Sequence, residues 1–295
     1  MCDAFSRLHP IINFTYFTSV ILFSMFFMHP AFLVISLICS FIYSVYLGGS
    51  KAVKFNLLSS LCIGLAISIL NPLFVHQGET ALFFLNDHGI TLESIAFGVG
   101  AGIMFVSVLI WFSCYHKVMT SDKFMYLFGS IIPALSLVLS MTLRFVPKFK
   151  AQLKVVEEGQ KSIGRGASQG TIFSMIRNGV KVISIMITWA LENGIETADS
   201  MKARGYGLKG RTSFSLYRFD SRDKKCLIYI TLNILIVLIG AYLGFNTIMF
   251  FPIIRYKSIS IVSVLFYISY TLLCIFPVIV NVREDMVWKR LRSTI

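Results

Sequence analysis

Six long apolar stretches constrain the fold of this chain more than any other feature. They cover approximately residues 11–28, 31–47, 55–70, 95–114, 226–243 and 258–280. Apart from the shorter third stretch, each approaches the roughly 20 residues with which a helix crosses a hydrocarbon core. Only 14% of the residues are charged, against about 25% in soluble proteins. The sequence therefore predicts an all-α, polytopic integral protein of the cell membrane.

The positions of the lysines predict which loops face the cytoplasm. The loop 71–93 contains no Lys or Arg, whereas the loops after the second and fourth stretches carry Lys51, Lys54, Lys117 and Lys123. Because positive loops stay inside, we expect the N-terminus and these lysines to be cytoplasmic and the loop 71–93 to be outside. The basic tail 282–295 is also expected inside. Arg255 and Lys257 would then be exceptions that face outside.

A basic segment, 144–225, lies between the apolar stretches. It holds 16 of the 27 Lys and Arg but only 7 of the 14 Asp and Glu. Charge placed between membrane stretches favours a cytoplasmic region over nucleic-acid binding. We expect transmembrane helices in 1–143, long cytoplasmic amphipathic helices in 144–222, and transmembrane helices with a basic tail in 223–295.

Within this basic region, the periodicity of apolar residues predicts two amphipathic helices. They cover about 147–165 and 176–204, and the charges near both ends of the second argue that it does not span the membrane. The stretch 124–147 before them is expected to lie along, or dip into, the cytoplasmic side of the membrane.

Two similar phrases occur in the basic segment, Lys-Ser-Ile-Gly-Arg-Gly at 161–166 and Met-Lys-Ala-Arg-Gly-Tyr-Gly at 201–207. Each predicts a helix whose last turn carries an Arg and which stops at the Gly immediately after it. The simpler interpretation is two helix ends that happen to carry Arg. Their repetition 39 residues apart favours a docking device, because a planar guanidinium can bond two carboxylate oxygens of a partner.

Motifs of an enzyme are missing from the sequence. It contains no His-Glu-x-x-His, Gly-x-Ser-x-Gly or Gly-x-x-x-x-Gly-Lys-Ser/Thr pattern. The six cysteines and five histidines are scattered without metal-ligand spacing. Gly98, Gly100 and Gly102 lie inside an apolar stretch, where small residues allow close helix packing. We expect no catalytic residue, no metal site and no cofactor in this chain.

Three phrases resemble the transmembrane T component of energy-coupling factor (ECF) transporters. They are Leu8-His9-Pro10 with Asn13, Leu143-Arg144-Phe145-Val146-Pro147, and the Ala-Arg-Gly-Tyr phrase at 203–206 with the following Arg211-Thr212. The first Arg phrase departs from the family, which often has Ala where Gly164 stands here. Because Gly costs about 1 kcal/mol of helix propensity against Ala, we expect a looser helix end there. An additional apolar stretch at the C-terminus is a second departure.

The resemblance implies a non-catalytic subunit of an ABC-type importer for a vitamin or a transition-metal ion. Two cytoplasmic ATPase subunits would bind ATP and Mg, and a membrane S component would bind and select the substrate. By this analogy the ATPase-contacting residues are Arg165, Gly166, Ala203, Arg204 and Gly205. The apolar faces of the cytoplasmic helices would hold the S component through Ile183, Ile187, Leu191 and Ile195.

Two other functions stay open. A self-contained secondary transporter would need polar sites in mid-membrane or broken helices, and uptake by this chain alone in liposomes would support it. A membrane enzyme or scaffold would use the basic segment to bind anionic lipid, and that binding would be sensitive to salt.

Overall fold

The computed structural model describes residues 3–75, 78–85, 88–129, 133–166, 171–208, 217–255 and 260–293. The chain forms two compact units, Met1–Phe124 with Tyr217–Ile295 (unit 1) and Met125–Leu216 (unit 2). In the described part, five helices are long and apolar enough to cross a membrane. The predicted class, an all-α multi-pass membrane protein, is confirmed. The predicted Arg211-Thr212 phrase and Lys257 lie outside the described residues.

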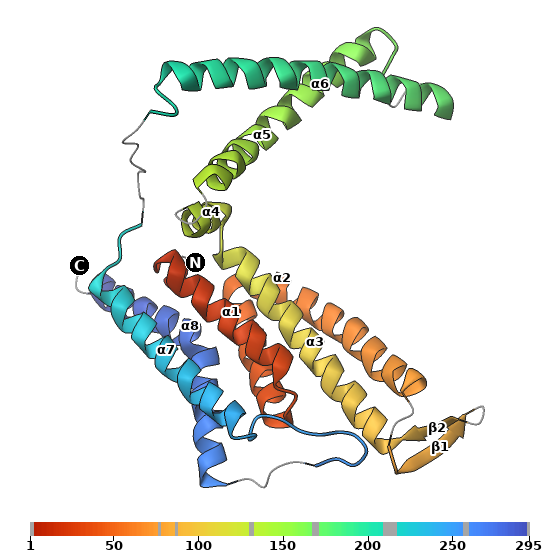
Figure 1. Cartoon of the computed structure of the whole chain (residues 1–295), viewed down its shortest axis with the longest axis vertical. Coiled ribbons are helices and arrows are strands. Elements are labelled where there is room, and N and C mark those ends of the chain that lie inside the picture. Colours follow the sequence, from red (N-terminus) through yellow and green to blue (C-terminus); the bar gives the residue numbers. More distant parts are fainter. Residues whose placement is uncertain are drawn as a thin grey trace. The chain divides into compact units, whose positions relative to one another are not determined.

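Unit 1 is an antiparallel helix bundle (Figure 1). Its main helices are α1 (Pro10–Phe26), α2 (Pro30–Phe74), α3 (Leu92–Val118), α7 (Ser221–Tyr242) and α8 (Ile261–Ser293). The start of α1, the end of α8, the start of α7 and the end of α3 lie together at one end of this bundle, which we call the basic end (Figure 1). A hairpin and the α7–α8 loop lie at the other end. The predicted cytoplasmic lysines of 117 and 123 therefore share one end, and Arg255 lies in the loop at the other.

Histidine–proline pairs start the first two helices. The ring Nδ1 of His9 accepts a hydrogen bond from the backbone N–H of Ile11 at 3.3 Å, and that of His29 accepts one from Ala31 at 3.3 Å. Each imidazole thus acts as an N-cap, while the proline at the first helical position lacks the N–H that would otherwise be unpaired. Burial lowers the pKa of both histidines, which keeps Nδ1 available as an acceptor.

An aromatic cluster fills the basic half of the bundle. The fully buried ring of Phe5 makes edge contacts with Tyr16 at 5.1 Å and with Phe276 at 6.0 Å between centroids. Trp111 is also fully buried, and its indole N–H donates to the hydroxyl of Ser36 at 3.0 Å. Edge-on aromatic pairs add roughly 0.5–1.5 kcal/mol each beyond their buried area. The N-terminal turn is therefore an integral part of the core.

Both points where the chain leaves unit 1 lie beside the same turn, residues 3–9. The ammonium group of Lys123, next to the first exit, donates a hydrogen bond to the carbonyl of Ser6. Near the second exit, the ring of Phe219 packs edge-on against that of His9 at 5.0 Å. Lys123 and Phe219, the unit 1 residues on either side of the unit 2 segment, thus contact the same turn at the basic end.

The second and third apolar stretches form one helical element rather than two helices with a loop. Helix α2 runs from Pro30 to Phe74 and is interrupted by Gly49, at φ 60 and ψ −151. Only glycine adopts this conformation readily, so Gly49 reverses the chain without a separate loop. The expected loop around Lys54 is therefore wrong: this lysine lies in the helix after the break.

The predicted loop 71–93 contains regular structure as well. Strands β1 (Ala81–Leu85) and β2 (His88–Thr91) pair antiparallel, with Phe84 opposite Gly89. Helix α3 follows directly, and the Thr91 hydroxyl caps it by accepting from the Ser94 N–H at 3.2 Å. The expected connection between the two helices thus contains a hairpin that the sequence interpretation did not include.

Close packing of α2 against α3 depends on small residues. A Cβ placed on Gly98 would lie 3.1 Å from the backbone oxygen of Ser68, and one on Gly102 would lie 2.8 Å from that of Gly64. Real Cβ atoms are not found under 3.0 Å from such neighbours. The prediction that these glycines allow helices to approach closely is confirmed for Gly98 and Gly102.

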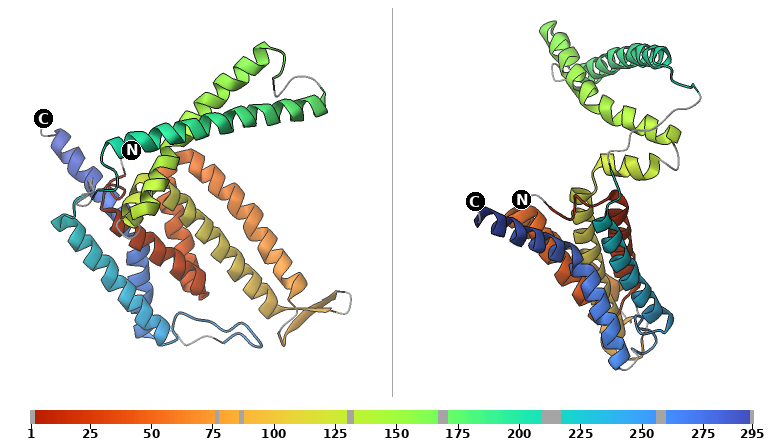
Figure 2. Two further views of the ribbon diagram at one scale, coloured as in Figure 1. Left: turned by 45° about the horizontal axis from the view of Figure 1, so that its top comes forward. Right: turned by 90° about the vertical axis from the view of Figure 1, so that its left-hand side faces the viewer.

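Unit 2 consists mainly of two long helices that cross, α5 (Pro133–Ser162) and α6 (Ile172–Ala203), preceded by the end of α4 (Ser121–Gly129) (Figure 2). At the crossing, the ring of Trp189 contacts Phe149 edge-on at 5.2 Å and lies under the Lys148 ammonium at 5.4 Å. Helix α5 continues through Pro147, where the sequence predicted a change of segment. A proline inside a helix costs about 3 kcal/mol, so the turns on either side of Pro147 must stabilise the helix enough to offset this cost.

Helix α6 begins four residues earlier than predicted and is one of the five helices with sufficient length and apolar content to span. It is the least apolar of the five. Only Val182 and Met186 of its residues are buried. Its amphipathic character agrees with the sequence, and the expectation that it does not cross the membrane stays a prediction.

Candidate docking site at the ends of α5 and α6

The second Arg phrase forms a hydrogen-bonded helix cap. Helix α6 ends at Ala203, Arg204 occupies the C-cap position, and Gly205 adopts φ +81. The N–H of Gly205 donates to the Lys202 carbonyl and that of Tyr206 to the Met201 carbonyl, both at 3.0 Å. These two bonds define a Schellman motif. The predicted order, an Arg followed by a stopping Gly, is confirmed at this end, and the Arg204 side chain is exposed.

The first Arg phrase forms the same motif in a different register. Helix α5 ends at Ser162, and Gly164 adopts φ +74. The N–H of Gly164 donates to Lys161 O at 3.1 Å and that of Arg165 to Gln160 O at 2.9 Å. Arg165 therefore follows the stopping glycine and lies outside the helix. The prediction that Arg165 is in the last turn and that the helix stops at the following residue was wrong.

Gly166 does not stop the helix, contrary to the prediction from the sequence, and its expected contact with an ATPase subunit stays a prediction. It is buried, and its carbonyl accepts a hydrogen bond from the side-chain amide of Asn178 at 3.3 Å. The expected looseness at Gly164 was also wrong, because helix propensity does not apply to a residue beyond the helix. At a left-handed φ, glycine is favoured over alanine by about 1–2 kcal/mol. The departure from the family pattern therefore strengthens this cap.

Superimposing the two caps by their hydrogen bonds shows that the arginines are not equivalent. Gly164 corresponds to Gly205, so Arg165 corresponds to Tyr206 and Arg204 to Ile163. Both cations are exposed at the end of a long helix. They project from positions two residues apart in the cap.

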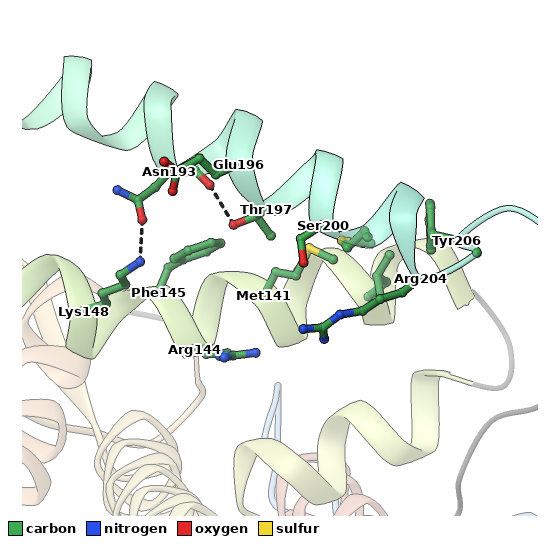
Figure 3. Close-up of a pocket in the computed structure, with 13 residues that line it drawn as sticks. Met141, Arg144, Phe145, Lys148, Asn193, Glu196, Thr197, Ser200, Arg204 and Tyr206 are labelled. Carbon is green, nitrogen blue, oxygen red and sulfur yellow. Dashed lines mark hydrogen bonds between the residues drawn. The ribbon is translucent and has the colours of Figure 1, made fainter.

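A pocket of about 750 Å³ adjoins Arg204 in unit 2. Figure 3 shows the guanidinium groups of Arg144, from α5, and Arg204, from α6, extending toward each other. Neither makes an ion pair with any described residue. The remaining lining residues are Leu137, Met141, Phe145, Lys148, Asn193, Glu196, Thr197, Ser200, Met201, Gly205 and Tyr206. Three cations and one carboxylate leave an excess of positive charge, which favours an acidic occupant.

An exposed apolar stripe runs along α6. The predicted residues Ile183, Ile187, Leu191 and Ile195 are 58%, 56%, 65% and 64% exposed. The stripe continues toward the start of the helix through four residues that the sequence interpretation did not include, Ile172, Phe173, Ile176 and Val180. Ile183 and Ile187 also line an apolar groove with Val146, Phe149 and Leu153 of α5. This groove and Arg204 lie on opposite sides of the helix crossing at Trp189. Contiguous exposed apolar surface of this kind marks an interaction site or contact with lipid.

A family comparison identifies the chain. The family described as CbiQ, cobalt transport protein, matches residues 7–214. The chain belongs to this family. In the described part of the chain, no three His, Cys, Asp or Glu side chains are grouped so that they could hold a metal ion.

Several relatives are named energy-coupling factor transporter transmembrane protein EcfT. The chain is 26% identical to the one from Staphylococcus aureus over 195 residues, which are 61% of this chain and 71% of the relative. It is 28% identical to the Listeria innocua protein over 174 residues, 55% of this chain and 65% of the relative. The match to the Lactococcus lactis protein is 27% and spans 40% of that relative. The resemblance to the transmembrane component of ECF transporters is therefore confirmed.

Sequence reasoning missed three residues of this site. Gly164 was taken for a weak point, whereas it forms the cap. Arg144 was noted only as part of a family phrase, although the crossing of the helices brings it to Arg204. Trp189 was not singled out, because an aromatic residue in an amphipathic helix carries no signal of the partner that it contacts.

Proposed function

We propose that this chain is the T component of an ECF-type importer, a non-catalytic subunit that links two cytoplasmic ABC-type ATPases to a membrane S component. The substrate would be a vitamin or a transition-metal ion selected by the S component. The observation that carries this proposal is Arg204, which is held at a hydrogen-bonded helix cap beside Arg144 and has no ion-pair partner among the described residues. Such a site suits a carboxylate of a partner protein.

The position of the chain exits supports a cytoplasmic location for unit 2. Lys123 donates to the Ser6 carbonyl, and Tyr217 packs against His9, so both contact the turn 3–9 at the basic end. The intervening segment therefore crosses the membrane an even number of times or not at all. Helix α5 carries four cations between Arg144 and Lys154 and is not among the candidate spans. If α6 crossed the membrane, a second helix of the same segment would have to cross back, and α5 is not a candidate for this. The apolar residues of α6 are therefore better explained as one exposed face of an amphipathic helix. Positive loops then place the basic end inside.

The apolar stripe on α6 supports contact with a membrane partner. Its residues recur at intervals of three or four from Ile172 to Ile195, which is the spacing of one helix face. A stripe of this length costs free energy when it faces water, because each exposed large aliphatic side chain forgoes roughly 1.5–3 kcal/mol of burial. An apolar protein in the membrane would cover it.

The following mechanism agrees with this geometry. The partner ATPases bind ATP and Mg, and their closure moves the two bound helix ends relative to each other. Because each end is fixed by a Schellman motif, movement at Arg165 or Arg204 is transmitted along a stiff helix to the crossing at Trp189. Helix α6 then turns the S component that lies on its stripe, so that the substrate site opens to the inside.

Charge reversal at Arg204 tests the proposal. We expect Arg204→Glu to abolish both co-purification of the ATPases and substrate uptake, while membrane insertion is unchanged. Lys202→Glu is the matched control, since it makes the same change in charge on an exposed residue of the same helix end. Retention of ATPases and uptake by Arg204→Glu, or an equal loss in Lys202→Glu, would contradict the proposed role.

Arg165→Glu extends the test to the other helix end. We expect it to weaken ATPase binding as well, because the same partner contact is proposed there. Uptake by the purified chain in liposomes without ATPases would support the secondary transporter instead.

A further inference from the structure

A second basic site lies between α7 and α8 at the basic end of unit 1. It is a groove of about 700 Å³, bordered by the start of α7 and the later turns of α8. Its lining residues are Ser221, Arg222, Lys225, Cys226, Phe276, Ile279, Val280, Arg283, Glu284, Val287, Trp288 and Leu291. The family match covers residues 7–214, so this groove lies outside the matched part of the chain.

The groove extends across the boundary between apolar and charged sequence. Helix α8 has 33 residues, or about 50 Å, whereas the hydrocarbon core is about 30 Å thick. Its first charged residue is Arg283, and on α7 the last one is Lys225. The part lined by Phe276 and Ile279 therefore lies at the depth of acyl chains. The cations lie at the depth of lipid head groups.

The acidic groups nearby are already engaged. Glu284 forms a 2.7 Å ion pair with Arg222. Asp223 is buried and accepts a hydrogen bond from the N–H of His9 at 3.3 Å, and Asp285 accepts one from the Tyr46 hydroxyl at 2.7 Å. These carboxylates do not pair with the remaining cations of the groove.

Two cations of the groove are left for a ligand. Lys225 and Arg283 are exposed and make no ion pair with any described residue. The groove thus has an excess of positive charge at its head-group end and apolar walls below it.

The end of α8 has the composition of a helix that lies at a membrane surface. Val287, Trp288 and Leu291 are 51%, 52% and 52% exposed, and they share a face because they are spaced at i, i+1 and i+4. Basic residues occupy the positions between and after them, Lys289, Arg290 and Arg292. Amphipathic helices with this pattern bind anionic bilayers, and tryptophan favours the interface.

We propose that the α7–α8 groove binds an anionic phospholipid of the cytoplasmic leaflet, with its phosphate between Lys225 and Arg283 and an acyl chain along Phe276 and Ile279. Both parts of the ligand are required by the groove, since a free phosphate would leave the apolar walls uncovered. A zwitterionic lipid such as phosphatidylcholine would bring its choline cation together with its phosphate, so the excess positive charge of the groove would stay uncompensated. This site is separate from the docking site at Arg204.

Lipid retention measured by native mass spectrometry tests the proposal. The full-length protein is purified in detergent and supplied with phosphatidylglycerol and phosphatidylcholine that have identical acyl chains. We expect preferential retention of phosphatidylglycerol, and a fall of about 30-fold in that preference in the double variant Lys225→Gln with Arg283→Gln. The magnitude follows from about 1 kcal/mol for each cation near an anionic surface, or about 2 kcal/mol for the two together.

The matched control removes the same charge elsewhere at the basic end, with Lys54→Gln and Lys117→Gln. We expect this control to keep the preference of the unaltered protein, and glycerol 3-phosphate to fail as a competitor because it lacks an acyl chain. Equal retention of the two lipids, an equal loss in the control, or displacement by glycerol 3-phosphate would overturn the proposal. Protection of the groove by an acidic protein partner in place of lipid would overturn it as well.

Discussion

The cap of α6 provides a sharp test of how the docking end is held. In Gly205→Ala, the backbone must keep φ +81 with a Cβ atom or give up the cap. A left-handed conformation costs an alanine about 1–2 kcal/mol. The new Cβ would also lie 3.0 Å from the Leu208 side chain, which must move slightly. We therefore expect the last turn to open about 5 to 30 times more often.

Hydrogen exchange of the backbone measures this opening directly. The amides of Gly205 and Tyr206, which form the two cap bonds, should exchange faster by that factor, and ATPase binding should weaken in parallel. Gly194→Ala is the control: its Cβ meets no atom within 4 Å, and inside a helix the change should stabilise by about 1 kcal/mol. If Gly205→Ala exchanged at the original rate and still bound the ATPases normally, the rigid-end argument would be refuted.

Three further predictions concern packing and pH. Gly102→Ala should lower the free energy of unfolding by about 1–3 kcal/mol, because its Cβ would lie 2.7 Å from the Ser68 hydroxyl; thermal denaturation checks this. Trp189→Ala should loosen the helix crossing by removing the ring contact with Phe149, which spin-label distances between α5 and α6 would show as a broader distribution. Burial lowers the pKa of His29 from its ordinary 6.5. As pH falls, the unfolded chain therefore binds a proton at this residue before the folded chain does, and stability should decrease below about pH 6.5. In melting curves, His29→Asn, which can still cap the helix, should make stability less dependent on pH.

The apolar pattern was sufficient to predict the membrane bundle but not its connections. In lipid, a helix pairs all the backbone groups of a long apolar run within the segment itself. The described part of each predicted run is mainly helical. The break at Gly49 and the hairpin at 81–91 escaped prediction for a common reason. A single glycine within an apolar run, or five apolar residues in a loop, gives no periodicity from which a turn or a strand can be inferred.

The position of the stopping glycine was predicted correctly at the end of α6 and wrongly at the end of α5. Both phrases contain Gly-Arg or Arg-Gly neighbours, so the sequence alone allows either glycine of the first phrase to stop the helix. The structure decides for Gly164, because it alone provides the left-handed residue for both cap bonds. Arg144 could not be assigned from sequence, since its proximity to Arg204 depends on where two helices cross rather than on spacing along either one.

The turn at residues 3–9 has a mechanical consequence. Lys123 and Phe219, which flank the two connections to unit 2, both contact this one short turn, and its Phe5 is embedded among the central rings. A force transmitted through either connection would therefore reach the transmembrane helices through this one turn. A force applied at one point of the bundle would tilt its helices together. Forces applied at opposite ends of the bundle would instead slide the helices past one another.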